Sequence, residues 1–346
     1  MSSTVVHNPS ALPVSDFGDV RAEFGQLVSG CGLLDLSARA KVTITGGDRV
    51  RWLNGMVTNN VRDLAPGHGV YTFLLNPQGH ILGDLYAYNR GESLLVDIDQ
   101  VQLEKTLATF DRYIIMDDVE VVNLGDKLTA TGIVGPKTAA TLQAAGFKSA
   151  QLEPLQLVDL SWQNRGMTLV RGDNPAVAWY ELWCAPGDVP PLHDALKQAG
   201  ARMAGGSAVD LLRIASGLPR YGQDIRERDL PQETEQERAL NFNKGCYIGQ
   251  EIVERIRSRG AVHRKLSGFE VRGPLPGPGT KIQWDGKDIG EITSAAVLPL
   301  PGGDRSVALG YLRREMAGLG RELRAGDAQL TVASLPFTHV VSSRND

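Results

Sequence analysis

Hydrophobic and polar residues alternate along this chain in short runs that indicate β-strands, and longer amphipathic runs between them indicate helices. Two stretches, 41–56 and 128–147, each pass from a β-branched strand through a Gly-Gly or Gly-Pro turn into a helical pattern. Each opens a longer series of strands with one further helix. This order is typical of α+β units in which helices cover one face of a mainly antiparallel sheet, as in ferredoxin-like split βαβ folds.

The pattern changes beyond residue 260. From 262 onward, short β-rich runs alternate with Asp-Gly and Gly-Gly turns, which predicts a small closed barrel or sandwich. A charged connection over 226–238 comes before it and is typical of a solvated surface segment. We therefore expect an α+β region over 1–235 made of two interleaved units at about 18–125 and 126–235, a junction over 236–260, and a C-terminal β-barrel over 261–346.

Composition and charge limit the classes of function. Hydrophobic residues make up 42% of the 346 residues and charged residues 22%, as in an ordinary soluble globular protein. The net charge of −4 provides no global basic field for nucleic acid or an anionic membrane. The N-terminus has no Lys or Arg before Arg21 and no sustained apolar run, which argues against a targeting peptide. We expect a cytoplasmic protein with no membrane contact.

The chain has three cysteines, Cys31, Cys184 and Cys246. Their odd number and wide spacing support neither a disulfide framework nor a cysteine metal site, so we predict no bound metal. Cys31 and Cys184 stand among apolar residues, where a small buried side chain is expected. Cys246 differs, because it lies in the stretch KGCYIGQE at 244–251.

This stretch has the features of a reactive thiol. The ammonium of Lys244, and the N-terminus of a helix expected to begin near residue 250, would each lower the pKa of the Cys246 thiol. Gly245 and Gly249 would let the backbone turn tightly and leave the sulfur approachable. The alternative is that Cys246 is a small buried residue at a domain junction and that the glycines serve only the turn.

The octapeptide resembles the signature of the YgfZ-type folate-binding proteins, Lys-Gly-Cys-(aromatic)-x-Gly-Gln-Glu. That family is implicated in assembly or maintenance of iron–sulfur enzymes and in the tRNA thiomodification that depends on them. The family is a branch of the folate-binding fold of the glycine-cleavage aminomethyltransferase (T-protein), which the chain resembles over 32–85, 211–224 and 289–297. The residues that match the signature are Lys244, Gly245, Cys246, Tyr247, Gly249, Gln250 and Glu251.

The resemblance implies a folate site. A pterin presents a 2-amino group beside a ring N–H, and one carboxylate can accept both. Glu181, preceded by the aromatic Tyr180, falls where the wider family places a pterin-contacting glutamate; otherwise it is an outward-facing strand residue. Tyr71, Asp97 and Arg213 match pocket-lining positions of that family. Tyr71 could stack on an aromatic ring and Arg213 could pair with an anionic group, unless they belong to the core or a helix surface.

The departures from the wider family concern acid–base groups. The aminomethyltransferases resemble one another in an Asp-Asp-Leu run, one aspartate of which helps handle the folate amine during transfer. Here the stretch reads GHILGDL, so Gly83 replaces one acid and Asp84 remains. A Tyr-Thr-Gly-Glu-Asp-Gly stretch is also replaced, by GDNPAVAW at 172–179. Such a site could bind folate without transferring an aminomethyl group, with Asp84 near the reactive end or, alternatively, only a solvated strand residue.

A basic run follows the cysteine. It usually means a solvated face, but here it could steer a polyglutamyl tail of folate or an acidic partner toward the thiol. Aromatic residues are not interleaved, which argues against direct nucleic-acid binding. The residues are Arg255, Arg257, Arg259, His263, Arg264 and Lys265.

Three functions follow for testing. The first is an accessory protein that binds tetrahydrofolate or a one-carbon derivative and uses Cys246, with Lys244 and Asp84 in the working site, to support iron–sulfur client enzymes or assembly proteins. The second is a folate-dependent aminomethyltransferase, so whether the protein is an enzyme stays open. The third is a thiol hydrolase or acyltransferase, which needs a base. Only His263 stands near Cys246 among the six histidines, His7, His68, His80, His193, His263 and His339.

Overall fold

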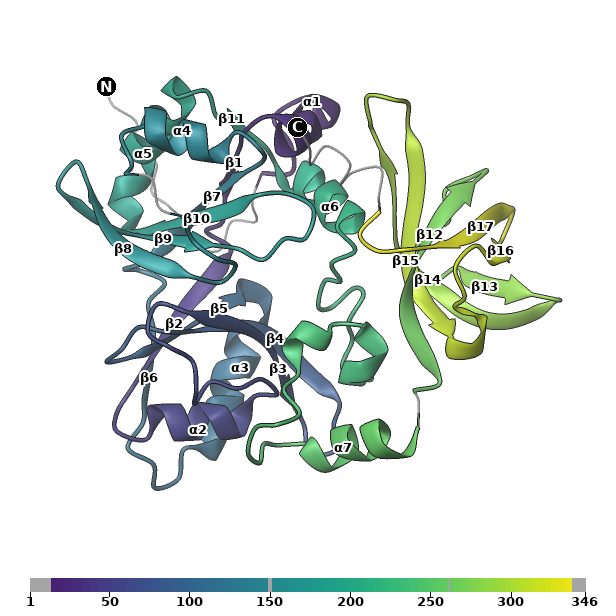
Figure 1. The fold of residues 1–346 in the computed structure, drawn as a ribbon, viewed down its shortest axis with the longest axis horizontal. Coiled ribbons are helices and arrows are strands. Elements are labelled where there is room, and N and C mark those ends of the chain that lie inside the picture. Colours follow the sequence, from purple (N-terminus) through teal and green to yellow (C-terminus); the bar gives the residue numbers. More distant parts are fainter. Residues whose placement is uncertain (1–13, 149–150, 261, 338–346) are drawn as a thin grey trace.

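The computed structural model describes residues 14–148, 151–260 and 262–337. Two sheets lie one above the other, and a barrel lies to one side of them (Figure 1). The predicted fold class is confirmed: an α+β region of two sheets is followed by a closed six-stranded barrel. In the described parts of the chain, no helix is both long and apolar enough to cross a membrane.

The first sheet has the strand order β3-β4-β5-β2-β6 and is antiparallel. Two helices cover one of its faces, and Trp52 meets Phe110 edge-on in the shared core with ring centroids 5.2 Å apart. The second of these helices begins after Asp99, whose side chain caps it by accepting from the N–H of Val101. The elements are β2 (Arg39–Thr45), α2 (Arg49–Met56), β3 (Gly69–Leu75), β4 (Ile81–Asn89), β5 (Leu94–Asp99), α3 (Gln100–Tyr113) and β6 (Glu120–Asn123).

The second sheet has the order β11-β1-β7-β10-β9-β8. Cys31 and Cys184 lie in the core between this sheet and its helices, as expected, and burial raises the pKa of both thiols. The elements are α1 (Val20–Ser29), β1 (Gly32–Asp35), β7 (Thr129–Val134), α4 (Thr138–Ala144), β8 (Leu157–Trp162), β9 (Arg165–Arg171), β10 (Trp179–Cys184), η1 (Pro186–Asp188), α5 (Val189–Gln198), β11 (Arg202–Met203) and α6 (Gly206–Ala215).

One expected boundary differs from the structure. Residues 18–125 do not form a single unit, because β1 leaves the first sheet and inserts between β7 and β11 of the second. Leu33 pairs with Ile133 in antiparallel register and with Met203 in parallel register. Both neighbours are far along the chain, so local sequence patterns carry no information on this pairing.

The barrel closes in the order β12-β15-β14-β13-β16-β17 around its own apolar core. A second apolar cluster joins it to α1 and α6, where Leu212 packs with Leu298 and Leu309. The elements are β12 (Arg264–Arg272), β13 (Lys281–Trp284), β14 (Lys287–Leu298), β15 (Arg305–Arg313), η4 (Arg314–Met316), β16 (Glu322–Ala325) and β17 (Ala328–Ala333).

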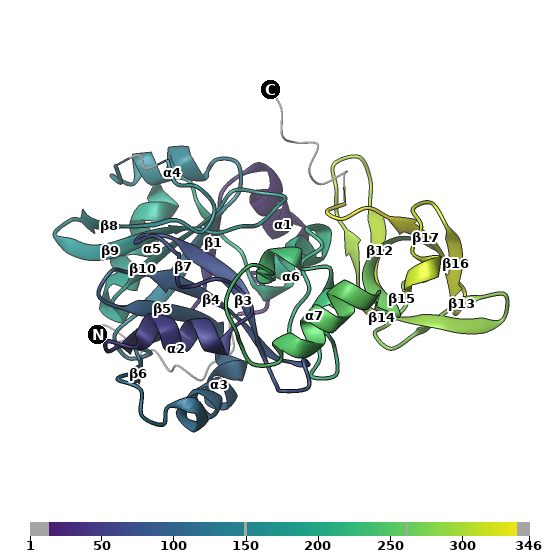
Figure 2. The same cartoon turned by 60° about the horizontal axis from the view of Figure 1, so that its bottom comes forward.

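The segment between α6 and the barrel contains η2 (Pro231–Thr234), η3 (Glu237–Ala239) and α7 (Gln250–Arg259). Helix α7 starts at Gln250 as expected and leads toward the barrel (Figure 2). The octapeptide therefore runs into the first turn of α7, the last helix before the barrel.

Candidate functional site

A cavity of about 350 Å³ lies between the two sheets. The first sheet contributes Tyr71, Asp84 and Asp97 to its wall, and the second contributes Glu181. Helix α6 contributes Arg213. Five of the six residues predicted for a folate site or its reactive end therefore come together around one space.

Tyr180 is the exception. Successive side chains of a strand point to opposite faces, so the neighbour of Glu181 must point away from the cavity. The ring of Tyr180 packs in the core on the other face of the sheet, and the guanidinium of Arg171 lies 4.7 Å from its centroid. Contrary to expectation, Tyr180 does not line the cavity.

Glu181 is held by two tryptophans from its own strand face. The indole N–H of Trp179 donates to Oε1 at 3.2 Å, and that of Trp183 donates to Oε2 at 2.8 Å. The carboxylate is buried, with 8% of the residue exposed, so the outward-facing alternative is wrong. Each carboxylate oxygen has more than one acceptor position, so both can still accept from a ligand.

Asp97 is enclosed by two cations. Arg39 Nε lies 3.1 Å from both carboxylate oxygens, and Lys41 Nζ donates to Oδ1 at 2.8 Å. Burial raises the pKa of Asp97, but the charges of Arg39 and Lys41 outweigh it and leave the pKa below its ordinary value. The carboxylate is therefore ionised and already neutralised, which makes it a poor proton acceptor.

Asp84 is fixed by two neutral donors. The hydroxyl of Tyr71 donates to Oδ2 at 2.7 Å and the amide of Gln102 donates to Oδ1 at 2.8 Å. Burial, and then the charge of Asp84, raise the pKa of Tyr71, so the phenol keeps its proton. A Cβ at Gly83 would stand 2.8 Å from Gln102 Oε1. The missing acid thus leaves room for a glutamine that holds the remaining one.

Arg238 and Asp173 were missed by the sequence interpretation. The guanidinium of Arg238 lies 4.2 Å from the centroid of Tyr71 and pairs with Asp173, which also accepts from the Tyr86 hydroxyl at 3.1 Å. The cation therefore covers the Tyr71 ring that was expected to stack on a ligand. No spacing in the charged connection could reveal this, because a charged run usually faces solvent.

Arg213 lines the cavity, but four of the five N–H groups of its guanidinium are used within the protein. It donates to Asp224 Oδ2 at 2.6 Å and to Ser294 Oγ in the barrel at 3.0 Å, and its Nε pairs with Asp210. The expected pairing with an anionic group of a ligand is therefore replaced by a bond between α6 and the barrel. The fully buried Asp224 also accepts from Thr293 Oγ1 at 2.5 Å.

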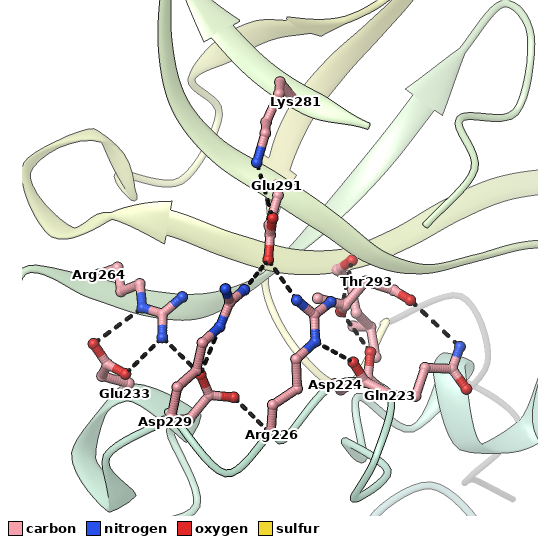
Figure 3. A network of polar contacts seen from close by, with 11 residues as sticks. Gln223, Asp224, Arg226, Asp229, Glu233, Arg264, Lys281, Glu291 and Thr293 are labelled. Carbon is pink, nitrogen blue, oxygen red and sulfur yellow. Dashed lines mark hydrogen bonds and ion pairs between the residues drawn. The ribbon is translucent and has the colours of Figure 1, made fainter. Parts of the chain in front are cut away.

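We call this contact, with its neighbours, the barrel joint (Figure 3). Glu291 of the barrel accepts from Arg226, Arg228 and Lys281. Arg264 donates to Glu233 and Asp229, and Lys265 pairs with Glu235. Arg264 of the predicted basic run is thus neutralised within the joint, and Lys265 is neutralised by Glu235 next to it. The joint consists of Arg213, Asp224, Arg226, Arg228, Asp229, Glu233, Arg264, Lys281, Glu291, Thr293 and Ser294.

Lys244 does not serve the thiol as expected. Its Nζ is buried at the end of α2, where it donates to the carbonyls of Asn54 at 2.5 Å, Val57 at 2.6 Å and Asn59 at 2.7 Å. An ammonium has three N–H groups, and all three are used. Burial, and then the charge of Arg62, lower the pKa of Lys244 to about 7, whereas the carbonyls favour the ammonium.

Tyr247 and Gly249 of the motif also pack inward, whereas the cysteine does not. Tyr247 belongs to a core cluster that includes Tyr71 of the cavity wall. Gly249 has a φ of 80°, and a Cβ there would stand 2.6 Å from the carbonyl oxygen of Asn76. Both the backbone conformation and the lack of space therefore require a glycine. Cys246 is exposed, so the alternative of a buried junction residue is wrong.

The remaining members of the motif flank this thiol. Gly245 has open space around it and Gly249 is the residue before α7, while Gln250 is half-buried and Glu251 is exposed in the first turn of the helix. The octapeptide therefore presents one exposed thiol next to side chains that are anchored in the protein.

Within the residues that the structure describes, no histidine forms a hydrogen bond with this thiol. His68 contacts Gln156, and His193 contacts Thr131. His263 is exposed, and His7 and His339 lie outside the described residues. The parts of the chain that the structure describes also contain no group of His, Cys, Asp or Glu that could hold a metal ion.

Comparisons with known proteins place this architecture. Residues 9–244 match the family described as the GCVT N-terminal domain, and residues 263–338 match the CAF17 C-terminal beta-barrel domain. The chain therefore belongs to the GCVT N-terminal domain family and carries a CAF17-type barrel.

The chain is similar in sequence to the aminomethyltransferase of Rubrobacter xylanophilus, with 29% identity over 339 residues that cover 97% of this chain and 90% of that protein. It is 27% identical to the aminomethyltransferase of Bacillus subtilis, covering 94% and 92% respectively. The crystal structure of glycine cleavage system aminomethyltransferase T from Bartonella henselae aligns with a TM-score of 0.86 at 23% identity, over 96% of this chain and 93% of that one. The last comparison establishes the shared fold.

Proposed function

We propose that this protein is a cytoplasmic, YgfZ-type accessory protein that binds tetrahydrofolate or a one-carbon derivative. In this proposal it supports iron–sulfur enzymes, and the tRNA thiomodification that depends on them, through Cys246. The observation that carries the proposal is the pairing of a cavity between the two sheets with an exposed thiol outside it. In this proposal the cavity is the binding site and Cys246 is the working thiol, and the two are separate.

The hydrogen-bond acceptors of the cavity fit a reduced pterin. Glu181 offers two carboxylate oxygens in one plane, which suits a 2-amino group beside a ring N–H. Asp84 offers a second acceptor, held in place by Tyr71 and Gln102. The apolar side chains of Phe17 and Trp179 also line the space, where an aromatic ring of the ligand could pack. Bound folate would supply one-carbon or redox chemistry, while these residues bind and orient it.

The aminomethyltransferase alternative is less well supported. A transfer reaction needs a group that moves a proton at the folate amine. Gly83 lacks the acid, Gln102 occupies the space beside it, and Asp97 is neutralised by Arg39 and Lys41. Binding without transfer fits these contacts better. Turnover of an aminomethyl carrier with tetrahydrofolate would decide for the enzyme instead.

The thiol supports a role with partner proteins. A single cysteine cannot hold a cluster that normally takes four cysteine ligands, so contact with a cluster would be shared with a client enzyme or an assembly protein. The exposure of Cys246 permits such sharing. The cluster would then be the cargo of the partner and not a resident group of this chain.

Calorimetry with tetrahydrofolate tests the folate site. We expect the wild type and Cys246→Ser to bind alike, and Glu181→Ala to bind at least about tenfold more weakly, since a hydrogen bond to a charged group contributes roughly 1.5–3 kcal/mol. Tyr180→Phe is the matched control, because it alters the next residue of the same strand on the face away from the cavity. No binding by the wild type would refute the folate role.

A second experiment tests the thiol. In cells that lack this protein, we expect the wild type to restore the activity of an iron–sulfur client enzyme and Cys246→Ser not to do so. Full restoration by Cys246→Ser would refute the thiol role and leave the folate site standing.

A further inference from the structure

The segment 238–247 connects the cavity to the thiol. Its first residue, Arg238, lines the cavity and lies over the ring of Tyr71. Near its other end Cys246 is exposed, between the buried side chains of Lys244 and Tyr247. Segment 238–247 therefore has one end at the cavity and the other end at the thiol of Cys246.

Asn59 ties both ends of this segment to the cavity wall. Its side-chain amide donates to the carbonyl of Tyr71 at 2.9 Å and to that of Arg238 at 2.8 Å. Its own carbonyl accepts from Lys244 Nζ at 2.7 Å. A single residue thus contacts the cavity strand β3, the start of the segment and the lysine two positions before Cys246.

Neighbouring contacts leave the segment little freedom. The hydroxyl of Thr58 donates to the carbonyl of Ala239 at 2.7 Å, and the N–H of Asn241 donates to the carbonyl of Thr58 at 3.1 Å. Tyr71, Ala239 and Tyr247 belong to one core cluster. Close-packed cores do not absorb a shift at one wall, so a change at Tyr71 is transmitted to Tyr247 and the adjacent thiol.

We propose that occupancy of the cavity controls the reactivity of Cys246, and that Asn59 is the positioning residue that couples the two. This inference rests on the proposed function, because it takes folate as the occupant. A ligand that packs against Arg238 and Tyr71 holds segment 238–247 in place. A segment held in this way cannot adjust around an incoming reagent, so the exposed thiol is modified more slowly. Coupling of this kind is reciprocal between the two sites.

The test uses tetrahydrofolate kept reduced with ascorbate, and N-ethylmaleimide as the thiol probe. Cys31 and Cys184 are buried, and Cys246→Ser measures their background reaction. We expect saturating tetrahydrofolate to slow modification of Cys246 by about fivefold or more, the lower range of measured couplings between sites. Protein already modified at Cys246 should bind tetrahydrofolate more weakly by the same factor.

Asn59→Asp is the decisive variant, because it removes the amide donor and keeps the size and the backbone carbonyl that Lys244 uses. This variant should bind tetrahydrofolate, but binding should no longer slow the modification of Cys246. Asn60→Asp is the matched control next to it, since within the described residues the side-chain amide of Asn60 bonds to Asp63 alone, and tetrahydrofolate should still slow modification of this variant. Should Asn59→Asp fail to fold, hydrogen exchange of the wild-type amides of 239–248 with and without ligand replaces it, with slower exchange expected on binding.

The outcomes separate the two proposals. If calorimetry shows binding but the modification rate changes less than twofold, or the exchange of 239–248 is unchanged, the coupling is refuted and the folate role stands. If tetrahydrofolate slows modification of Cys246 in Asn59→Asp as much as in the wild type, Asn59 is not the coupling residue. If the wild type does not bind tetrahydrofolate, both the proposed function and this coupling fail.

Discussion

The cavity and the barrel joint are both rich in buried carboxylates, but they hold them differently. In the cavity, Glu181 and Asp84 each accept from two neutral donors. In the joint, Asp224 accepts from Arg213 and two hydroxyls, and Glu291 accepts from three cations. A carboxylate held by neutral donors keeps its charge available for a ligand, whereas one surrounded by cations serves to join two parts of a chain.

The comparison also explains two misplaced expectations. Arg213 has the residue type of an anion-binding group, but its partners belong to the joint. Asp97 lies in the cavity and is nevertheless held like a joint residue, between Arg39 and Lys41. The number and charge of its hydrogen-bond partners therefore predict the role of a buried ionic residue better than its residue type or its position in the fold.

The largest effect is expected from Asp224→Ala. Removing this fully buried carboxylate breaks the buried ion pair with Arg213, which keeps Asp210 at its Nε, and breaking a buried pair costs about 3–5 kcal/mol in proteins. The free energy of unfolding from urea titration should fall by that amount. Asp304→Ala, at an exposed pair with Arg21, is the control and should cost at most about 1 kcal/mol. Equal losses in the two variants would break the distinction between a joint residue and a surface pair.

The next effect concerns the cavity and affects binding instead of stability. Asp84→Asn keeps the size of the side chain and removes the charge that Tyr71 and Gln102 hold. We expect tetrahydrofolate to bind about tenfold more weakly, while the free energy of unfolding changes by about 1 kcal/mol, the scale of one hydrogen bond. Calorimetry and urea titration on the same sample measure both. A large loss of stability with unchanged binding would place Asp84 with the joint residues.

The joint also predicts a dependence on acid. Burial raises the pKa of Glu291, but Lys281 and the arginines around it leave the pKa below 4.5. A lowered pKa gives stability that is present above the unfolded value and is lost as the pH falls through the folded one. Glu291→Gln should therefore cost about 1 kcal/mol at pH 7 and progressively less below pH of about 4.5. A difference that stays constant down to pH 2 would show that the charge of Glu291 is not the cause.

The smallest effect belongs to Cys246→Ser. The thiol is exposed and the residues around it carry the packing, so the free energy of unfolding should change by less than about 0.5 kcal/mol. Tetrahydrofolate affinity should also be unchanged within about twofold. Thermal unfolding and calorimetry check both. Strong destabilisation would mean that the thiol is a structural group, like the carboxylates of the joint.

Sequence patterns predicted the parts of the fold that local chemistry determines. The alternation of the strands, the closed barrel and the start of α7 at Gln250 are of this kind. Strand alternation alone would have excluded Tyr180, because its neighbour Glu181 was already assigned to the cavity. The patterns were silent on contacts between distant segments, such as Lys244 with Asn54 or Arg213 with Ser294. Those contacts decide what a charged side chain does, and only the folded chain brings them together.

The placement of β1 has a consequence for how the protein reaches this state. Strand β1 pairs on one side with β7 and on the other with β11, which ends at Met203. During synthesis one edge of β1 stays unpaired until β11, which lies beyond the midpoint of the chain, has left the ribosome. Such pairings over long stretches of sequence are slow to form, and exposed edges favour aggregation in the meantime. Strand β1 is therefore secured only after strands that are made much later, and its free edge is a place where a chaperone would protect the chain in the meantime.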